Sequence, residues 1–215
     1  IPDFLIRSQI RRLNQRRLKS EAQKHANGYK AELVKELKSS PIAIETIAAN
    51  DQHYEVPPEF FEKCLGKHLK YSCCYWPNEV TNLDQAESSM LDLTCERAEL
   101  KDGQTILELG CGWGAISLWM AEHYPNSKIL SVSNSNDQRK FIEKTAAQRG
   151  LQNLQVQTCD MNRFETDQTF DRVVSVEMFE HMKNYDELLR RINKWLNSEG
   201  KLFVHIFSIS DLRVP

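Results

Sequence analysis

A glycine-rich segment at residues 106–114 offers the clearest chemistry in this sequence. It reads Ile-Leu-Glu-Leu-Gly-Cys-Gly-Trp-Gly, which places Glu108, Gly110, Gly112 and Gly114 at a predicted strand-to-helix junction. Glycines let the backbone turn sharply and approach a ligand closely, and the following helix start offers free N–H groups. The spacing E-x-G-x-G-x-G differs from the G-x-G-x-x-G that holds a pyrophosphate. The acidic residue suits a nucleotide-like cofactor that carries an ammonium or sulfonium charge.

Polar side chains also follow the next two predicted strands. Ser133, Asn134 and Gln138 follow the second strand, and their hydroxyl and amide groups can hold ribose hydroxyls through neutral hydrogen bonds. Asp160 and Met161 follow the third strand and suit an adenine, since a carboxylate accepts from the exocyclic amine and a thioether lies against the ring. The alternative for Asp160 is an ordinary turn residue. In a parallel sheet the carboxyl ends of the strands meet where the ligand binds.

Glu177, Glu180 and His181 follow the fourth predicted strand and are the catalytic candidates. Two carboxylates and an imidazole that lie close together shift one another's pKa and can accept a proton near neutral pH. The alternative is a helix cap at Glu180 and a surface imidazole at His181. Cys111 and Cys159 lack paired ligand spacing, so we expect no metal site.

Regular alternation of strands and helices from residue 101 onward must position these side chains. Strands are expected to begin at residue 106 and to span 128–132, 154–158, 172–176 and 201–207, with helices over 115–122, 137–149 and from 184 to a stop at 198–200. Gly150 suits the left-handed position after a helix, and Asn184 with Glu187 resembles a capping box. This pattern predicts an α/β fold, with a Rossmann-like doubly wound, mainly parallel sheet.

The N-terminal half is predicted to be helical. We expect an N-terminal helical segment over 1–50, an accessory segment that covers the cofactor over 51–100, and the cofactor-binding domain over 101–215. Within the first two, helices are expected at 5–19, 31–38, 59–65 and 83–97, with a helix breaker at 51–58. The first helix is basic and amphipathic, so it either packs its apolar stripe on the domain or contacts acidic lipid headgroups or an acidic partner.

Composition excludes several classes of protein. The chain has 215 residues and a net charge of -2, which suits one α/β domain with an accessory segment and gives no electrostatic case for binding nucleic acid. No apolar run is long enough to span a bilayer, and we expect no secretory leader. The 6 cysteines contain no C-x-x-C pair, so reduced thiols in a cytoplasmic protein are the simplest interpretation.

Several stretches together resemble class I S-adenosylmethionine-dependent methyltransferases. More narrowly, the chain is similar to the cyclopropane-fatty-acid-synthase superfamily and its coclaurine N-methyltransferase-like branch. The resemblance covers about residues 50–207, and its motifs are His53–Pro57, Tyr71–Trp76, Glu108–Gly114, Ser133–Gln138 and Glu177–Tyr185.

This resemblance implies S-adenosyl-L-methionine as cofactor and methyl transfer to a small-molecule amine. It implies cofactor contacts from Tyr71 and Ser72, the methionine portion beside Gly110, the ribose at Asn134 and Gln138, and the adenine between Asp160 and Met161. It implies that Glu180 and His181 handle the amine proton, with Glu177 nearby. A protonated amine has no lone pair, so it must lose its proton before it attacks a methyl group. In the lipid-modifying branch, the resemblance places Cys111 in a bicarbonate site instead.

The end of the chain departs from the family pattern. Family members continue beyond the fifth strand, whereas Ser208–Pro215 does not resemble that continuation. We therefore expect missing C-terminal strands, an exposed sheet edge that favours a homodimer, and cofactor affinity that survives better than turnover. Two alternatives remain open: an enzyme that modifies lipid acyl chains, and a cofactor-binding form without turnover.

Overall fold

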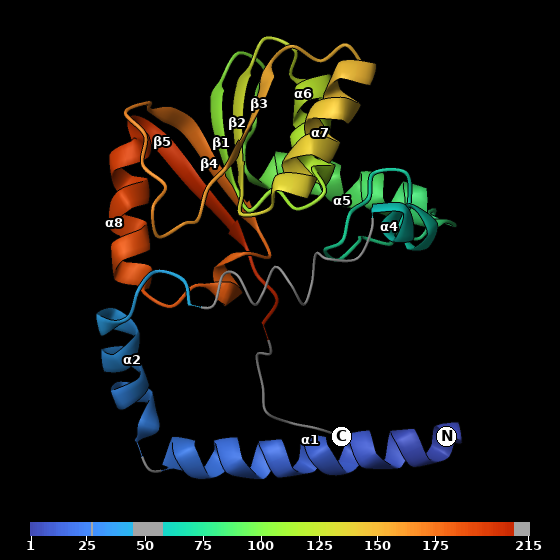
Figure 1. The fold of residues 1–215 in the computed structure, drawn as a ribbon, viewed down its shortest axis with the longest axis vertical. Coiled ribbons are helices and arrows are strands. Elements are labelled where there is room, and N and C mark those ends of the chain that lie inside the picture. The colour runs from blue at the N-terminus through green and yellow to red at the C-terminus, as the bar shows by residue number, and fades with distance from the viewer. Residues whose placement is uncertain (27, 45–57, 209–215) are drawn as a thin grey trace. The chain divides into compact units, whose positions relative to one another are not determined.

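The computed structural model describes residues 1–26, 28–44 and 58–208 (Figure 1). Its internal contacts separate residues 1–40 from residues 41–207 as two units, which we describe one at a time. The predicted helix breaker at residues 51–58 lies outside the described residues except for Pro58, which begins the helix α4 (Pro58–Cys64), and the resemblance at His53–Pro57 lies wholly outside them.

The first unit contains two helices, α1 (Asp3–Ala26) and α2 (Tyr29–Ser39), joined through Gly28 in a left-handed conformation with φ 74°. The apolar residues Ile6, Ile10 and Leu13 of α1 recur on one face and are exposed. Arg17 follows Leu13 by four residues and falls on that same face. The predicted helix is confirmed, but its apolar stripe is short and is interrupted by a charge. None of the helices in the described ranges has the length and apolar character to cross a bilayer.

The second unit is built on a five-stranded parallel sheet. Its strands are β1 (Thr105–Leu109), β2 (Lys128–Ser133), β3 (Leu154–Thr158), β4 (Phe170–Val176) and β5 (Leu196–His205), in the spatial order β3-β2-β1-β4-β5. The order reverses between β1 and β4, and such a reversal opens a crevice at the carboxyl ends of the strands. The predicted α/β, Rossmann-like, doubly wound sheet is confirmed.

Helices cover both faces of this sheet (Figure 1). The helices α5 (Leu83–Arg97), α6 (Ala115–His123) and α7 (Asn136–Gln148) cover one face, and α8 (Tyr185–Trp195) covers the other. Side chains of β1 alternate accordingly: Ile106 packs in the cluster that holds Met120 of α6, while Leu107 packs in the cluster that holds Trp195 of α8. Glu108 therefore faces the α6 side together with Ile106.

Most predicted helix ends are confirmed. Gly150 has φ 72° immediately after the last cap residue of α7, as a glycine in this position should. Asn184 caps α8, since its side chain accepts a hydrogen bond from the N–H of Glu187 at 3.1 Å. The carboxylate of Glu187 turns instead to Arg191, at 2.8 Å.

The predicted end of this helix at residues 198–200 is wrong. The helix α8 ends at Trp195, and β5 begins at Leu196 without an intervening turn. The pairing of β5 with β4 is irregular between Phe170 and Arg172. The residues that the sequence pattern assigned to a helix stop lie in this irregular part of β5. Gly200 is required there because a Cβ would lie 2.8 Å from the carbonyl oxygen of Phe170.

Candidate functional site

A cavity of about 380 Å³ opens where β1, β2, β3 and β4 end. Gly110, Asn134, Cys159 and Glu177 each follow one of these strands, and all four line the cavity. Further lining residues come from the loop before α5, from α5, α6 and α7, from residues 43–44 and from the short helix η1 (Phe179–His181). The cavity therefore lies at the topological switch point of the sheet, where the sequence predicted a ligand.

Nearly all predicted site residues meet at this cavity. The predicted residues that line it are Tyr71, Ser72, Glu108, Gly110, Gly112, Ser133, Asn134, Gln138, Met161, Glu177, Glu180 and His181. The structure thus brings together groups that the sequence spreads over more than a hundred positions. Their individual contacts with a ligand stay predictions.

Gly114 and Asp160 are not among the lining residues, and both have a structural task. Gly114 is the N-cap of α6 with φ 84°, and a Cβ there would lie 2.6 Å from a side-chain carbon of Ile142. The Asp160 carboxylate accepts a hydrogen bond from the backbone N–H of Asn162 at 2.7 Å and shapes the turn after β3. For Asp160 this geometry matches the alternative of a turn residue.

Glu108 is buried deep in the wall of the cavity, with 2 % of its surface exposed. Its carboxylate accepts hydrogen bonds from the hydroxyls of Ser131, at 2.7 Å, and Ser117. Burial raises the pKa of Glu108 to about 7, because desolvation of the charge outweighs the two hydroxyl donors. A cationic ligand group in the cavity would favour the ionised form.

The ends of β2 and α7 present an amide group to the cavity. Ser133 donates its hydroxyl hydrogen to the carbonyl oxygen of the Gln138 side chain at 2.6 Å, and both residues are buried. The Nε2 group of Gln138 then has no hydrogen-bond partner within the described part of the chain. A buried donor without a partner is costly, so this position suits a ligand oxygen such as a ribose hydroxyl.

Glu87 holds the loop that leads to Tyr71 and Ser72. This fully buried residue of α5 accepts backbone hydrogen bonds from Gly66 at 2.9 Å, His68 at 2.8 Å and Lys70 at 3.2 Å. A Cβ at Gly66 would lie 2.7 Å from the Glu87 carboxylate, so the loop requires a glycine at its closest approach. The sequence pattern did not reveal this carboxylate.

Lys70 is a second residue that the sequence did not single out. It lines the cavity with 4 % of its surface exposed, and its ammonium donates to the Ser72 hydroxyl and, at 2.7 Å, to the Cys73 carbonyl. Burial lowers the pKa of Lys70, although Glu177 and Glu87 oppose this shift. An ammonium has three donors, and the Ser72 hydroxyl and the Cys73 carbonyl are both neutral acceptors. Lys70 can therefore hold a carboxylate of a ligand.

The predicted proton acceptors line the cavity at the end of β4 and in η1. Glu177 has φ 50°, an uncommon conformation for a residue with a side chain, and its N–H donates to the carbonyl of His205 at 2.7 Å. Glu180 accepts a hydrogen bond from the N–H of Phe207 through Oε1 at 3.3 Å, while its shielded Oε2 has no partner among the described residues. His181 ends η1 and lines the cavity beside them.

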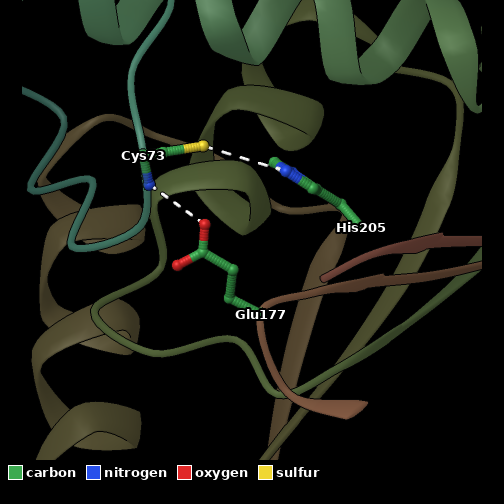
Figure 2. Close-up of side chains that lie close together, drawn as sticks. All are labelled: Cys73, Glu177 and His205. Carbon is green, nitrogen blue, oxygen red and sulfur yellow. Dashed lines mark hydrogen bonds between the residues drawn. The ribbon is translucent and has the colours of Figure 1, made fainter. Parts of the chain in front are cut away.

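Cys73 and His205 join Glu177 in a cluster that the sequence did not reveal (Figure 2). The Cys73 N–H donates to the Glu177 carboxylate at 3.1 Å, and the Cys73 Sγ lies 3.8 Å from the His205 Nε2. One thiol, one carboxylate and one imidazole can jointly hold a metal ion. Local spacing gives no signal for this cluster, because Cys73 and His205 are 132 positions apart.

The sequence profile described as mycolic acid cyclopropane synthetase matches residues 43–213. The chain belongs to the mycolic acid cyclopropane synthetase family. Within this family it falls in the coclaurine N-methyltransferase branch, as the resemblance predicted. It is 44% identical over 207 residues to (S)-coclaurine N-methyltransferase of Thalictrum flavum subsp. glaucum, covering 95% of this chain and 57% of the relative.

Solved structures place the chain in the same branch of the family. A coclaurine N-methyltransferase bound to N-methylheliamine and SAH matches with a TM-score of 0.87 and 41% identity, over 95% of this chain and 60% of that one. The mycolic acid cyclopropane synthase CmaA1, complexed with SAH and CTAB, matches with a TM-score of 0.67 and 26% identity, over 76% and 57% of the two chains. The chain thus spans a little over half the length of these relatives.

Proposed function

We propose that this chain forms the cofactor-binding part of an S-adenosyl-L-methionine-dependent enzyme that methylates the nitrogen of a small-molecule amine. One observation carries the proposal: most of the predicted cofactor residues and the predicted proton acceptors Glu177, Glu180 and His181 line a single cavity. The relatives named coclaurine N-methyltransferase support the same reaction.

The cavity fits the cofactor in polarity and in shape. Gln138 Nε2 and Trp113 Nε1 are buried, lack partners in the described part of the chain and belong to residues that line the cavity. Gly112 has φ 52° with open space where a Cβ would stand, so the backbone there leaves room for a ligand. S-adenosyl-L-methionine would supply an electrophilic methyl group. Gln138 would hold its ribose, Met161 its adenine and Gly110 its methionine portion.

The residues at the end of β4 would prepare the amine. An ammonium cannot attack until a base takes its proton, and Glu180 with His181 would accept it at a carboxylate or imidazole position. The unpartnered Oε2 of Glu180 leaves an acceptor free for this purpose. The carboxylate charges of Glu177 and Glu180 would also balance a cationic substrate, and the walls of the cavity would orient it for attack.

Calorimetry with S-adenosylhomocysteine, beside methyl-transfer assays on a panel of cyclic and linear amines, tests the proposal. We expect one bound cofactor per chain and slow turnover that falls at least about 100-fold in Glu180→Ala and His181→Ala, the usual size of an acid–base contribution. Glu96→Gln, an exposed carboxylate of α5, serves as the control and should leave the rate unchanged.

Two other outcomes would replace this proposal. Cofactor binding without turnover on any amine would mean a cofactor-binding form. Transfer to unsaturated phospholipid vesicles, but not to amines, would support the lipid-modifying alternative, in which Cys111 serves a bicarbonate site. Cys111 is buried in the cavity wall, and burial raises the pKa of its thiol well above the usual value. No cofactor binding at all would overturn both enzyme proposals.

We also propose that the chain works in the cytoplasm and that α1 contacts acidic lipid surfaces weakly. The free thiols of Cys64 and Cys73 are exposed, which suits a reducing compartment, and the arginines of α1 lie on an exposed helix. Sedimentation with anionic and neutral vesicles tests the lipid contact, and light scattering tests the proposed homodimer. Binding that is equal for both vesicle types would argue against an electrostatic contact.

A further inference from the structure

We propose that Cys73, Glu177 and His205 form a binding site for a thiophilic divalent cation such as Zn²⁺. The three side chains come from three segments: the loop before α5, the end of β4 and the end of β5. One sulfur, one carboxylate oxygen and one imidazole nitrogen lie within 4.8 Å of one another. Figure 2 shows the thiol and the imidazole directed toward each other, with the Glu177 carboxylate beside Cys73.

The separation of the sulfur and the nitrogen matches tetrahedral coordination of an ion. With a Zn–S bond near 2.3 Å and a Zn–N bond near 2.1 Å, tetrahedral geometry places sulfur and nitrogen roughly 3.6 Å apart. The Cys73 Sγ and the His205 Nε2 are 3.8 Å apart. Only a small adjustment of Cys73 and His205 would therefore be needed to bind an ion, and the Glu177 carboxylate oxygen lies within 4.8 Å of both of their ligand atoms.

The donor set selects the kind of cation. Mg²⁺ and Ca²⁺ prefer oxygen ligands, whereas a thiolate and an imidazole favour Zn²⁺ and its neighbours among the transition metals. Three protein ligands leave the fourth position of a tetrahedron for water or another small ligand. The thiol must lose its proton to the solvent on binding. Deprotonated Cys73 and Glu177 then supply two negative charges against the single positive charge of Lys70 nearby.

Backbone hydrogen bonds already hold the ligand residues together. The N–H of Cys73 donates to the Glu177 carboxylate at 3.1 Å, and the N–H of Glu177 donates to the carbonyl of His205 at 2.7 Å. The left-handed conformation of Glu177 belongs to this arrangement. Preorganised ligands lose little conformational entropy when the ion binds.

Occupation of this site would have a functional consequence, which rests on the proposed methyl transfer. Glu177 lines the cavity, so an ion that takes its carboxylate would remove one of the charges that balance the amine. The fold would then contain a metal-sensitive inhibitory site at the edge of the catalytic cavity. The site itself rests on geometry alone, and binding can be measured without turnover.

Titration of the full chain with Co²⁺ reads the ligands directly, because a thiolate bound to Co²⁺ gives an intense near-ultraviolet charge-transfer band. We expect one Co²⁺ per chain with this band, displaced by Zn²⁺. Cys73→Ser should abolish the band, and His205→Asn and Glu177→Gln should each weaken binding at least about tenfold. Cys64→Ser removes another exposed thiol, in α4 (Pro58–Cys64), and should leave the band intact.

Two results would overturn the proposal: the absence of a thiolate band in the wild type, and a band that persists in Cys73→Ser. If Cys73→Ser fails to fold, the His205→Asn variant tests the proposal instead. Unchanged Co²⁺ affinity in that variant, measured from the thiolate band, would also contradict the site. In the turnover assay, Zn²⁺ should inhibit the wild type and Cys64→Ser equally, with at least about tenfold weaker inhibition of His205→Asn. Binding without inhibition would keep the site and reject its functional consequence.

Discussion

The carboxylate of Glu87 accepts the backbone N–H of His68 at 2.8 Å, and it thereby fixes the loop whose next residues enter the cavity. Glu87 also accepts hydrogen bonds from the N–H groups of Gly66 and Lys70. This single side chain therefore satisfies backbone donors that a helix or strand would otherwise satisfy.

We expect Glu87→Ala to destabilise the protein by about 3 kcal/mol, because it leaves several shielded N–H groups without an acceptor. Affinity for S-adenosylhomocysteine should fall as well, since Tyr71 and Ser72 lose their support. Urea unfolding and calorimetry measure the two effects. Glu96→Gln on the exposed side of the same helix is the control, and equal stability of both variants would contradict the role of Glu87.

Lys70 should bind the carboxylate of a ligand. We expect Lys70→Met to lower the affinity for S-adenosylhomocysteine about 10- to 100-fold, because it removes a shielded charge-assisted hydrogen bond. Binding of 5′-methylthioadenosine, which lacks the amino-acid part, should change less than about threefold. Calorimetry with both ligands separates a direct contact from a structural role. An equal loss for the two ligands would assign Lys70 to positioning Ser72 and Cys73 instead.

Glu108 should make stability depend on pH in a specific direction. Its pKa is raised from 4.5 to about 7 in the folded state, so the stability that this group contributes is fully present below pH 4.5 and is lost as pH rises through about 7. Compared with Glu108→Gln, the wild type should lose about 3 kcal/mol over this window. Urea unfolding of both proteins at several pH values measures the difference between their free energies of unfolding. The contributions of the other titratable groups are the same in both proteins and cancel in this difference. A pH-independent difference would mean that Glu108 ionises normally.

Two neighbouring glycines should respond differently to alanine. Gly114→Ala places a Cβ 2.6 Å from Ile142, so we expect a loss of at least about 2 kcal/mol in stability with little change in cofactor affinity. In Gly112→Ala the added Cβ meets no neighbouring atom and points into open space beside the cavity. We therefore expect this variant to lose about 1 kcal/mol in stability and to bind the cofactor about tenfold more weakly. Thermal unfolding and calorimetry on both variants check this contrast. A large loss of cofactor affinity in Gly114→Ala, with little change in Gly112→Ala, would instead support Gly114 as a ligand contact.

Much of the fold follows from local patterns in the sequence. Short apolar runs that alternate with helical segments predicted the strands, and caps at Asn184 and Gly150 predicted helix ends, because these signals depend on neighbouring residues. The start of β5 did not follow from them. It depends on the approach of Gly200 to the carbonyl of Phe170, a contact between distant positions that no local pattern records.

The candidate site divides in the same way. Residues that follow a strand, such as Gly110, Asn134 and Glu177, could be predicted, because a parallel sheet brings all strand ends to one edge. Glu87 and His205 could not be predicted from the sequence as site residues. Their roles depend on hydrogen bonds to loops elsewhere in the chain, and their own neighbours in sequence give no sign of a site.

The reversal of strand order between β1 and β4 has an evolutionary consequence. Many of the lining residues come from the single stretch between Glu108 and Gln138, while others come from short, separate segments such as residues 69–72 and 176–182. Selection can therefore replace the pieces one at a time while the continuous stretch keeps its ligand. A family that contains both a coclaurine N-methyltransferase and a mycolic acid cyclopropane synthase is consistent with such a division.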